Sequence, residues 1–111
     1  MNLENKGLTV EGYLKENGYR KVAIYGYGYI GKQLYGRLKR EGVAISYIID
    51  RNAEFLDADV RVYALEPDLP KVDLVIVTLV EQEQAVVEQI KEKVSADVLS
   101  IKELLNKVKV K

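Results

Sequence analysis

The chain has 111 residues, of which 48% are apolar and 31% charged, and its 17 basic side chains balance its 17 acidic ones. This length allows one compact domain, and the composition is typical of a globular protein. Zero formal net charge gives no bulk attraction to nucleic acids or to anionic membranes. Because the sequence contains neither cysteine nor histidine, disulfides, thiolate chemistry and the commonest zinc ligands are excluded.

Neither a targeting signal nor a membrane span is predicted. Residues 1–6 contain charges where a signal peptide needs an apolar run. The longest apolar stretch, around residues 72–80, is far below the ~20 residues that span a bilayer. We therefore expect a cytoplasmic protein with no nucleic-acid and no membrane partner. Residues 1–18 are predicted to form a polar lead-in and a short amphipathic helix, and residues 19–111 the main domain.

Short apolar runs alternate with amphipathic segments along the rest of the chain. The pattern predicts helices after the first, fourth and last of five strands, which are expected at residues 22–25, 44–49, 60–63, 72–77 and 96–99. Capping-box patterns at residues 78–81 and 100–103 are expected to begin the last two helices. The order of elements predicts a three-layer α/β Rossmann-like domain with a mostly parallel five-stranded sheet, ordered 3-2-1-4-5.

The segment between the first strand and the next helix has the pattern G-x-G-x-x-G. It follows a buried strand and opens a helix, and Asp50 ends the next strand, as the dinucleotide-binding fingerprint requires. Gly26 is expected to permit the tight turn, Gly28 to leave room for a phosphate, and Gly31 to bring the helix close to the sheet. The helix N-terminus would offer N–H groups to an anion.

Residues beside the turn complete the predicted site. Asp50 is expected to accept hydrogen bonds from ribose hydroxyls, which favours NAD, whereas Arg51 can accommodate the 2′-phosphate of NADP; the sequence leaves this choice open. At least one of Tyr27 and Tyr29 is expected at the ligand mouth, where its ring packs on a sugar or a base. The predicted binding residues are Gly26, Tyr27, Gly28, Tyr29, Ile30, Gly31, Asp50, Arg51 and Thr78. Alternatively, the glycines serve only the turn and the helix packing, and Asp50 is a solvated strand end.

The sequence predicts no catalytic residues and no metal site. Tyr35 and Lys39 have the Tyr-x-x-x-Lys spacing of short-chain dehydrogenases, but they lie on the predicted phosphate-binding helix, so we interpret them as a solvated pair. Gly36, inside the same helix, is expected to mark close packing against another element or another chain.

A family resemblance extends over residues 19–105. Its best-defined parts are residues 19–35 (YRKVAIYGYGYIGKQLY), 47–50 (YIID), 60–65 (VRVYAL), 73–78 (DLVIVT) and 98–105 (VLSIKELL). These segments resemble short Rossmann modules of bacterial surface-polysaccharide and glycosyltransferase proteins. They are also similar to the N-terminal nucleotide-sugar-binding domain of bacterial sugar acyltransferases. The latter resemblance implies a UDP-sugar held by the glycine turn and Asp50, without the left-handed β-helix that carries acyl transfer in those enzymes.

Three functions remain open at this point. The leading expectation is a non-catalytic module that binds a nucleotide, a dinucleotide such as NAD(P), or a nucleotide-sugar such as a UDP-sugar, within a larger polysaccharide-biosynthesis protein. The alternatives are the NAD(P)-binding domain of an oxidoreductase, with its substrate domain elsewhere, and a structural or oligomerisation domain without a ligand. Apolar residues in both terminal helices favour a two-fold dimer, unless these helices complete the outer layers of a monomer.

Overall fold

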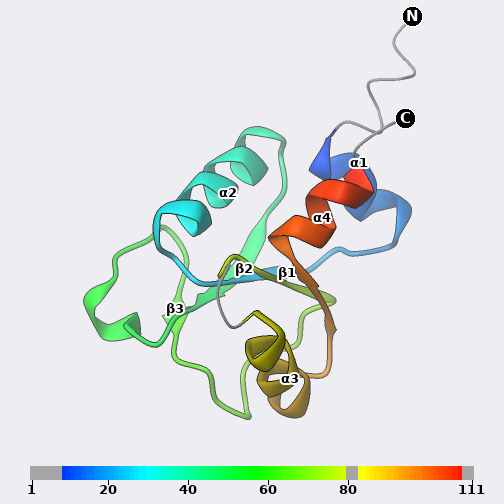
Figure 1. Cartoon of the computed structure of the whole chain (residues 1–111). Helices are drawn as coiled ribbons and strands as arrows, with labels where there is room; N and C mark the ends of the chain where they lie inside the picture. Colours follow the sequence, from blue (N-terminus) through cyan, green and yellow to red (C-terminus); the bar gives the residue numbers. More distant parts are fainter. Residues whose placement is uncertain (1–8, 80–82, 109–111) are drawn as a thin grey trace, which may run out of the picture.

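The computed structural model describes residues 9–79 and 83–108, which form an α/β domain around one sheet. The sheet has five strands in the order β3-β2-β1-β4-β5, and every neighbouring pair is parallel (Figure 1). The predicted fold class and strand order are thus confirmed. The strands are β1 (Val22–Tyr25), β2 (Ile45–Ile49), β3 (Val62–Tyr63), β4 (Leu74–Val77) and β5 (Asp97–Ser100).

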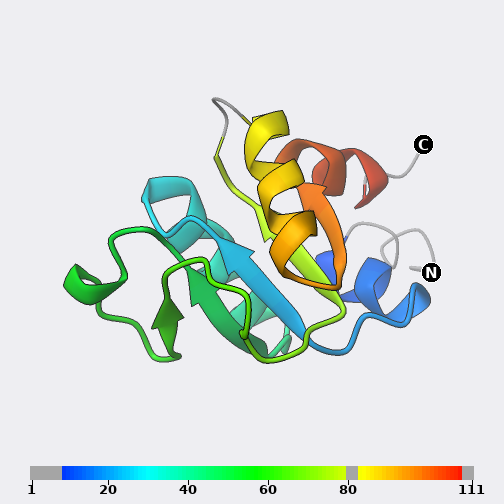
Figure 2. The same ribbon diagram turned by 90° about the horizontal axis from the view of Figure 1, so that it is seen from below.

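Helices cover the sheet on both faces. Three helices pack on one face: α1 (Val10–Glu16), α2 (Tyr29–Arg40) and α4 (Ile101–Val108). The opposite face is covered by α3 (Glu83–Lys93) and by parts of the loop between β3 and β4 (Figures 1 and 2). A short 3₁₀ helix, η2 (Ala53–Phe55), lies in the otherwise irregular connection from β2 to β3.

The central strands are buried on both faces, which explains their unbroken apolar sequence. In β1, Val22 and Ile24 pack with α1, α2 and α4, whereas Ala23 packs with α3 on the other face. Tyr25 continues this alternation, so its ring lies on the α3 face at the carboxyl end of the strand. Because of this direction, the Tyr25 ring can line a cleft only on the α3 face of the sheet.

One predicted capping box is confirmed, and the other involves residues outside the described part of the chain. At the start of α4, the Glu103 amide donates to Ser100 Oγ and the Ser100 amide donates to Glu103 Oε1, both at 3.0 Å. The described part of α3 starts at Glu83. The Thr78 hydroxyl lies 3.0 Å from the carbonyl oxygens of both Tyr25 and Gly26. Glu81, the predicted partner, lies outside the described residues.

Candidate functional site: the glycine turn and its cleft

The glycine turn lies where the chain leaves the central strand. β1 has β2 on one side and β4 on the other, so the strand order reverses at β1. The helix that follows β1, α2, and the helix that follows β4, α3, pack on opposite faces of the sheet. In open parallel sheets, such a switch point at the carboxyl ends of the strands is where ligands bind. The Gly26 amide donates to the Ile49 carbonyl at 2.7 Å, which fixes the start of the turn against β2.

Gly26 and Gly31 are required by the fold itself. Gly26 has a φ of +99°, in the left-handed region that favours glycine, and a Cβ there would lie 2.6 Å from Thr78 Oγ1. A Cβ at Gly31 would overlap the carbonyl oxygen of Gly26. The first turn of α2 therefore rests directly on the backbone of the glycine turn, as the spacing predicts.

Gly28 differs from both of these glycines. Its φ of −81° suits any residue, and a Cβ built on it would meet no atom of the described residues within 4 Å. Helix N-caps favour glycine over alanine, but neither a left-handed backbone conformation nor a close contact among the described residues requires glycine at this position. The space beside Gly28 opens into a cleft, which a side chain would narrow.

The N-terminus of α2 points its free amides at the same place. Gly28 is the N-cap residue, and no side chain caps the helix. Within the described part of the chain, the amides of Tyr29, Ile30 and Gly31 donate to no protein acceptor. The first turn contains no acidic residue. An anion at this point would therefore receive several N–H groups and the positive end of the helix dipole.

Asp50 links the end of β2 to the glycine turn. Its Oδ2 accepts a hydrogen bond from the Tyr27 amide at 2.8 Å, and its Oδ1 accepts one from the Asn52 amide at 2.9 Å. The carboxylate thus holds the turn in place before any ligand arrives. Each carboxylate oxygen retains further acceptor capacity, so ribose hydroxyls remain chemically acceptable partners.

Thr78 fastens the turn from the other side. The residue is buried, and its Oγ lies 3.0 Å from the carbonyl oxygens of both Tyr25 and Gly26. Its amide also donates to the Tyr25 carbonyl at 3.0 Å. Thr78 therefore positions the glycine turn, and its side chain does not line the cleft.

The tyrosines of the turn face away from the cleft. The Tyr27 ring packs edge-on against Tyr35, with centroids 6.1 Å apart, and Lys32 Nζ lies 5.6 Å from its centroid. Tyr29 is 79% exposed, and neither ring lines the cleft. The aromatic side chain that does so is Tyr25, which precedes the first glycine.

The cleft itself has a volume of about 380 Å³, within the usual range for small-molecule sites. It is lined by the glycine turn, the segment after β2 and residues of α3. Its lining residues are Tyr25, Gly26, Gly28, Asp50, Arg51, Asn52, Leu79, Ala85, Val86 and Gln89. The contribution of α3 was not predicted, although the spacing of Ala85, Val86 and Gln89 does put them on one helix face.

Charges in the cleft act on the Tyr25 phenol. Partial burial raises its pKa, the positive charge of Arg51 lowers it, and the carboxylate of Asp50 raises it. The phenol therefore stays protonated at neutral pH and can donate a hydrogen bond. No hydrogen bond engages its hydroxyl in the part of the chain that the structure describes.

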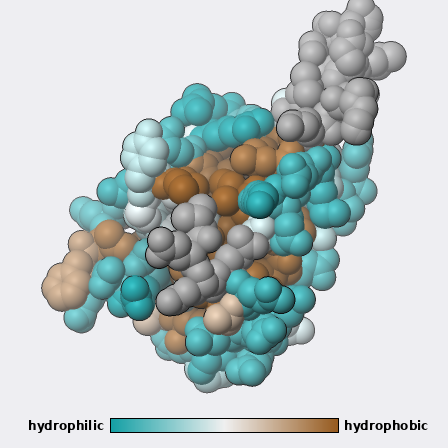
Figure 3. Space-filling view, in the orientation of Figure 1, coloured by the Kyte–Doolittle hydropathy of each residue, from teal (hydrophilic) through white to brown (hydrophobic). Residues whose placement is uncertain are grey.

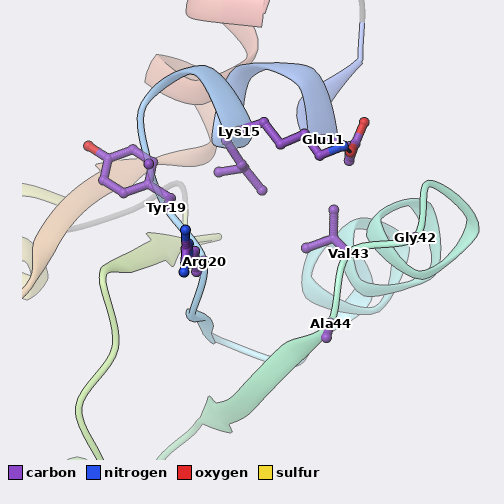
Figure 4. Close-up of a pocket in the computed structure, with 9 residues that line it drawn as sticks. Glu11, Lys15, Tyr19, Arg20, Gly42, Val43 and Ala44 are labelled. Carbon is purple, nitrogen blue, oxygen red and sulfur yellow. Dashed lines mark ion pairs between the residues drawn. The ribbon is translucent and has the colours of Figure 1, made fainter.

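A second hollow lies at the opposite edge of the sheet. It has a volume of about 460 Å³ and lies between α1 and the segment that follows α2 (Figure 4). Its rim is tied together within the chain, because Lys15 pairs with Glu11 at 3.0 Å and the Glu11 amide donates to Glu41 Oε1 at 2.9 Å. None of the predicted binding residues lies there.

The structure also places the remaining residues singled out in the sequence. No three metal-ligating side chains come together in residues 9–79 and 83–108. Lys39 Nζ lies 5.9 Å from the Tyr35 ring centroid and pairs with Asp59 at 2.7 Å, so this pair is engaged on the outer side of α2. Gly36 makes no close contact with another described element, since among the described residues a Cβ there would meet only Arg40 Nη1 of the same helix, at 3.4 Å; the expected approach of another chain stays a prediction.

The terminal helices cover each other within one chain. α1 contacts α4, and both bury their apolar faces in the core that the sheet shares with α2. The buried side chains include Val10, Leu14, Leu104 and Val108. The predicted N-terminal apolar residues Leu3 and Leu8 lie outside the described residues. The apolar faces from which a dimer was predicted therefore have partners in the monomer.

Comparisons with known proteins add no family assignment. No protein-family model matches the chain, and no curated protein matches it significantly. Among the described residues, no helix has both the length and the apolar character that a membrane span needs.

Proposed function

We propose that this chain is a cytoplasmic ligand-binding module that holds a nucleotide, a dinucleotide or a nucleotide-sugar without catalysing a reaction of its own. NAD(P) and UDP-sugars are the leading ligands, and a larger polysaccharide-biosynthesis protein is the proposed context. The phosphate groups lie against the backbone of residues 27–31, at the N-terminus of α2. Asp50 and Arg51 face the sugar of the nucleotide.

Gly28 is the observation that supports this proposal. A domain that used its glycines only for the turn and the helix packing would need Gly26 and Gly31, and both are indeed required by their surroundings. Gly28 has no such requirement, yet it borders the cleft and the free amides of α2. A ligand that approaches the backbone closely accounts for a glycine there.

The test is a thermal-shift and calorimetric panel with NAD, NADP, UDP-glucose and coenzyme A. We expect at least one of these to bind the wild-type chain, and Gly28→Val to abolish that binding because its side chain occupies the phosphate space. The melting temperature of Gly28→Val without ligand should stay close to that of the wild type. Gly36→Ala, which adds a methyl group to the same helix away from the cleft, is the matched control and should bind normally. Unchanged affinity in Gly28→Val would sink the proposal.

A further inference from the structure

The cleft residues outside the glycine turn combine apolar side chains with mixed hydrogen-bonding groups. Leu79, Ala85 and Val86 supply the apolar surface. Around them lie the Tyr25 phenol, the side-chain amides of Asn52 and Gln89, and the guanidinium of Arg51. In the described chain, no hydrogen bond engages these four side chains.

The phenol and amide groups of the cleft can both donate and accept hydrogen bonds. A hydroxyl group both donates and accepts, so a ring with several hydroxyls is matched by phenol and amide groups that also do both. Arg51 offers donors only and Asp50 already accepts two backbone amides, so neither alone provides that match. The C–H face of a sugar ring, in turn, packs well on an aromatic ring.

The position of Tyr25 fits this role. Its ring is packed on the α3-side core at the carboxyl end of the central strand, so its direction is fixed before a ligand binds. Its hydroxyl is not sealed in the interior, because the described chain contains no fully buried polar side-chain atom without a partner. By contrast, two other tyrosine hydroxyls form hydrogen bonds within the fold. Tyr19 donates to the Asp97 carboxylate, and Tyr47 donates to the Pro70 carbonyl.

We propose that this part of the cleft binds a sugar ring, which Tyr25 and Gln89 recognise through its hydroxyls. The inference rests on the proposed function, since the phosphate attached to that sugar lies at the glycine turn. The sugar can be the ribose of a nucleotide or the hexose of a nucleotide-sugar, and both present the same hydroxyl chemistry.

The test uses titration calorimetry on the full chain with ADP, UDP-glucose and inorganic pyrophosphate. Tyr25→Phe retains the ring and its packing but removes the hydroxyl, and Gln89→Leu removes the amide from the exposed face of α3. Each variant should bind the sugar-bearing probe about threefold to tenfold more weakly, the effect of one lost hydrogen bond. Pyrophosphate, which has no sugar, should bind both variants as it binds the wild type.

Two arms identify the sugar. If the ribose fills the cleft, Tyr25→Phe weakens ADP and UDP-glucose alike, and if the hexose fills it, only UDP-glucose is weakened. Tyr13→Phe is the matched control, because this tyrosine lies on α1 at the other edge of the sheet. Its affinities should stay within about twofold of the wild type.

The failures are distinguishable. If Tyr25→Phe and Gln89→Leu bind every probe like the wild type while Gly28→Val binds none, the sugar site is wrong and the proposed function stands. If Tyr25→Phe weakens pyrophosphate binding as much as ADP binding, Tyr25 acts by supporting the glycine turn and does not recognise the sugar. That result also overturns the inference. If the wild-type chain binds none of the three probes below ~1 mM, the inference falls, and if it also binds neither NAD nor NADP, the proposed function falls with it.

Discussion

The glycines of the turn differ in the atoms that an added Cβ would meet at each position. A methyl group at Gly31 would overlap the Gly26 carbonyl, so α2 could keep its place only by moving away from the sheet. We expect Gly31→Ala to lower the free energy of unfolding by about 1–3 kcal/mol, the usual range for overpacking. Gly28→Ala should cost less, about 0.5–1 kcal/mol, because its methyl group meets no described atom within 4 Å and only the N-cap preference for glycine over alanine is lost. Urea denaturation of both variants measures the contrast, and equal stabilities would contradict it.

Asp50 has a structural task as well as a proposed ligand contact. Asp50→Ala leaves the Tyr27 amide without its acceptor, so we expect unfolding to become easier by about 1–3 kcal/mol. Nucleotide binding should weaken by a similar amount, partly because the turn loosens. Asp50→Asn, which keeps one acceptor oxygen, should lie between the wild type and Asp50→Ala. Urea denaturation and calorimetry on the same samples check this, and a fully stable Asp50→Ala would show that Asp50 does not hold the turn.

The sequence pattern predicts residue positions better than side-chain directions. The spacing of Gly26 and Gly31 was enough to predict why each is a glycine, because both requirements are backbone geometry. It could not predict that Tyr27 turns toward Tyr35 and Lys32, since ring contacts on the outside of α2 depend on tertiary packing. For the same reason Tyr25 was missed, although it directly precedes the motif.

At the scale of the element, Gly36 is a weak point in α2. Within the described chain no close contact requires a glycine here, since an added Cβ would meet only the end of the flexible Arg40 side chain, at 3.4 Å. Gly36→Ala should therefore stabilise the protein by roughly 0.5–1 kcal/mol, the difference in helix propensity. The midpoint of urea denaturation should rise with an unchanged slope. A loss of stability would indicate that another chain or segment approaches α2 at Gly36.

Asp73 ties the start of β4 to the segment before β1. Its Oδ2 accepts the amides of Lys21 at 2.9 Å and Arg20 at 2.8 Å, and these bonds hold the pKa of Asp73 below its usual range. A lowered pKa in the folded state contributes stability above the unfolded pKa of about 3.9, and this contribution is lost as the pH falls through the folded value.

Asp73→Asn should therefore be less stable than the wild type at pH 7, and the two should converge as the pH falls below about 4. Asp68→Asn, at an exposed loop carboxylate without a described hydrogen bond, is the control and should show no such convergence. Denaturation midpoints measured from pH 7 to 3 give the comparison. A difference between wild type and Asp73→Asn that persists at pH 3 would rule out the charge as its cause.

Element order was predictable because it follows from hydrophobic runs and their spacing. Side-chain contacts were not predictable in this way: the pattern at Thr78 predicts a helix cap, and in the fold its hydroxyl also donates to the carbonyls of Tyr25 and Gly26. The part of the cleft that α3 lines depends on the packing of this helix against β4 and β5. No local pattern contains this information.

At the scale of the whole molecule, the layers place the glycine turn, Asp50 and the cleft-lining residues of α3 at one edge of the sheet. None of the described residues of α1 and α4 lines the cleft. These two helices bury apolar side chains against each other and complete the outer layer of one chain. What stays exposed lies elsewhere. Apolar surface gathers between α2 and α4 in the space-filling view (Figure 3). Ile30 of α2 is 36% exposed and Leu105 of α4 is 43% exposed.

Self-association, if it follows the usual two-fold geometry, should use the apolar side chains that stay exposed on α2 and α4, among them Leu105 of α4. We predict a dimer at micromolar concentration and its loss in Leu105→Glu, which places a charge on that surface while Leu104 and Val108 keep α4 anchored. Sedimentation velocity on both proteins gives the answer. Circular dichroism should show the same fold for each. A wild-type chain that sediments as a single species of 12.6 kDa would rule the dimer out.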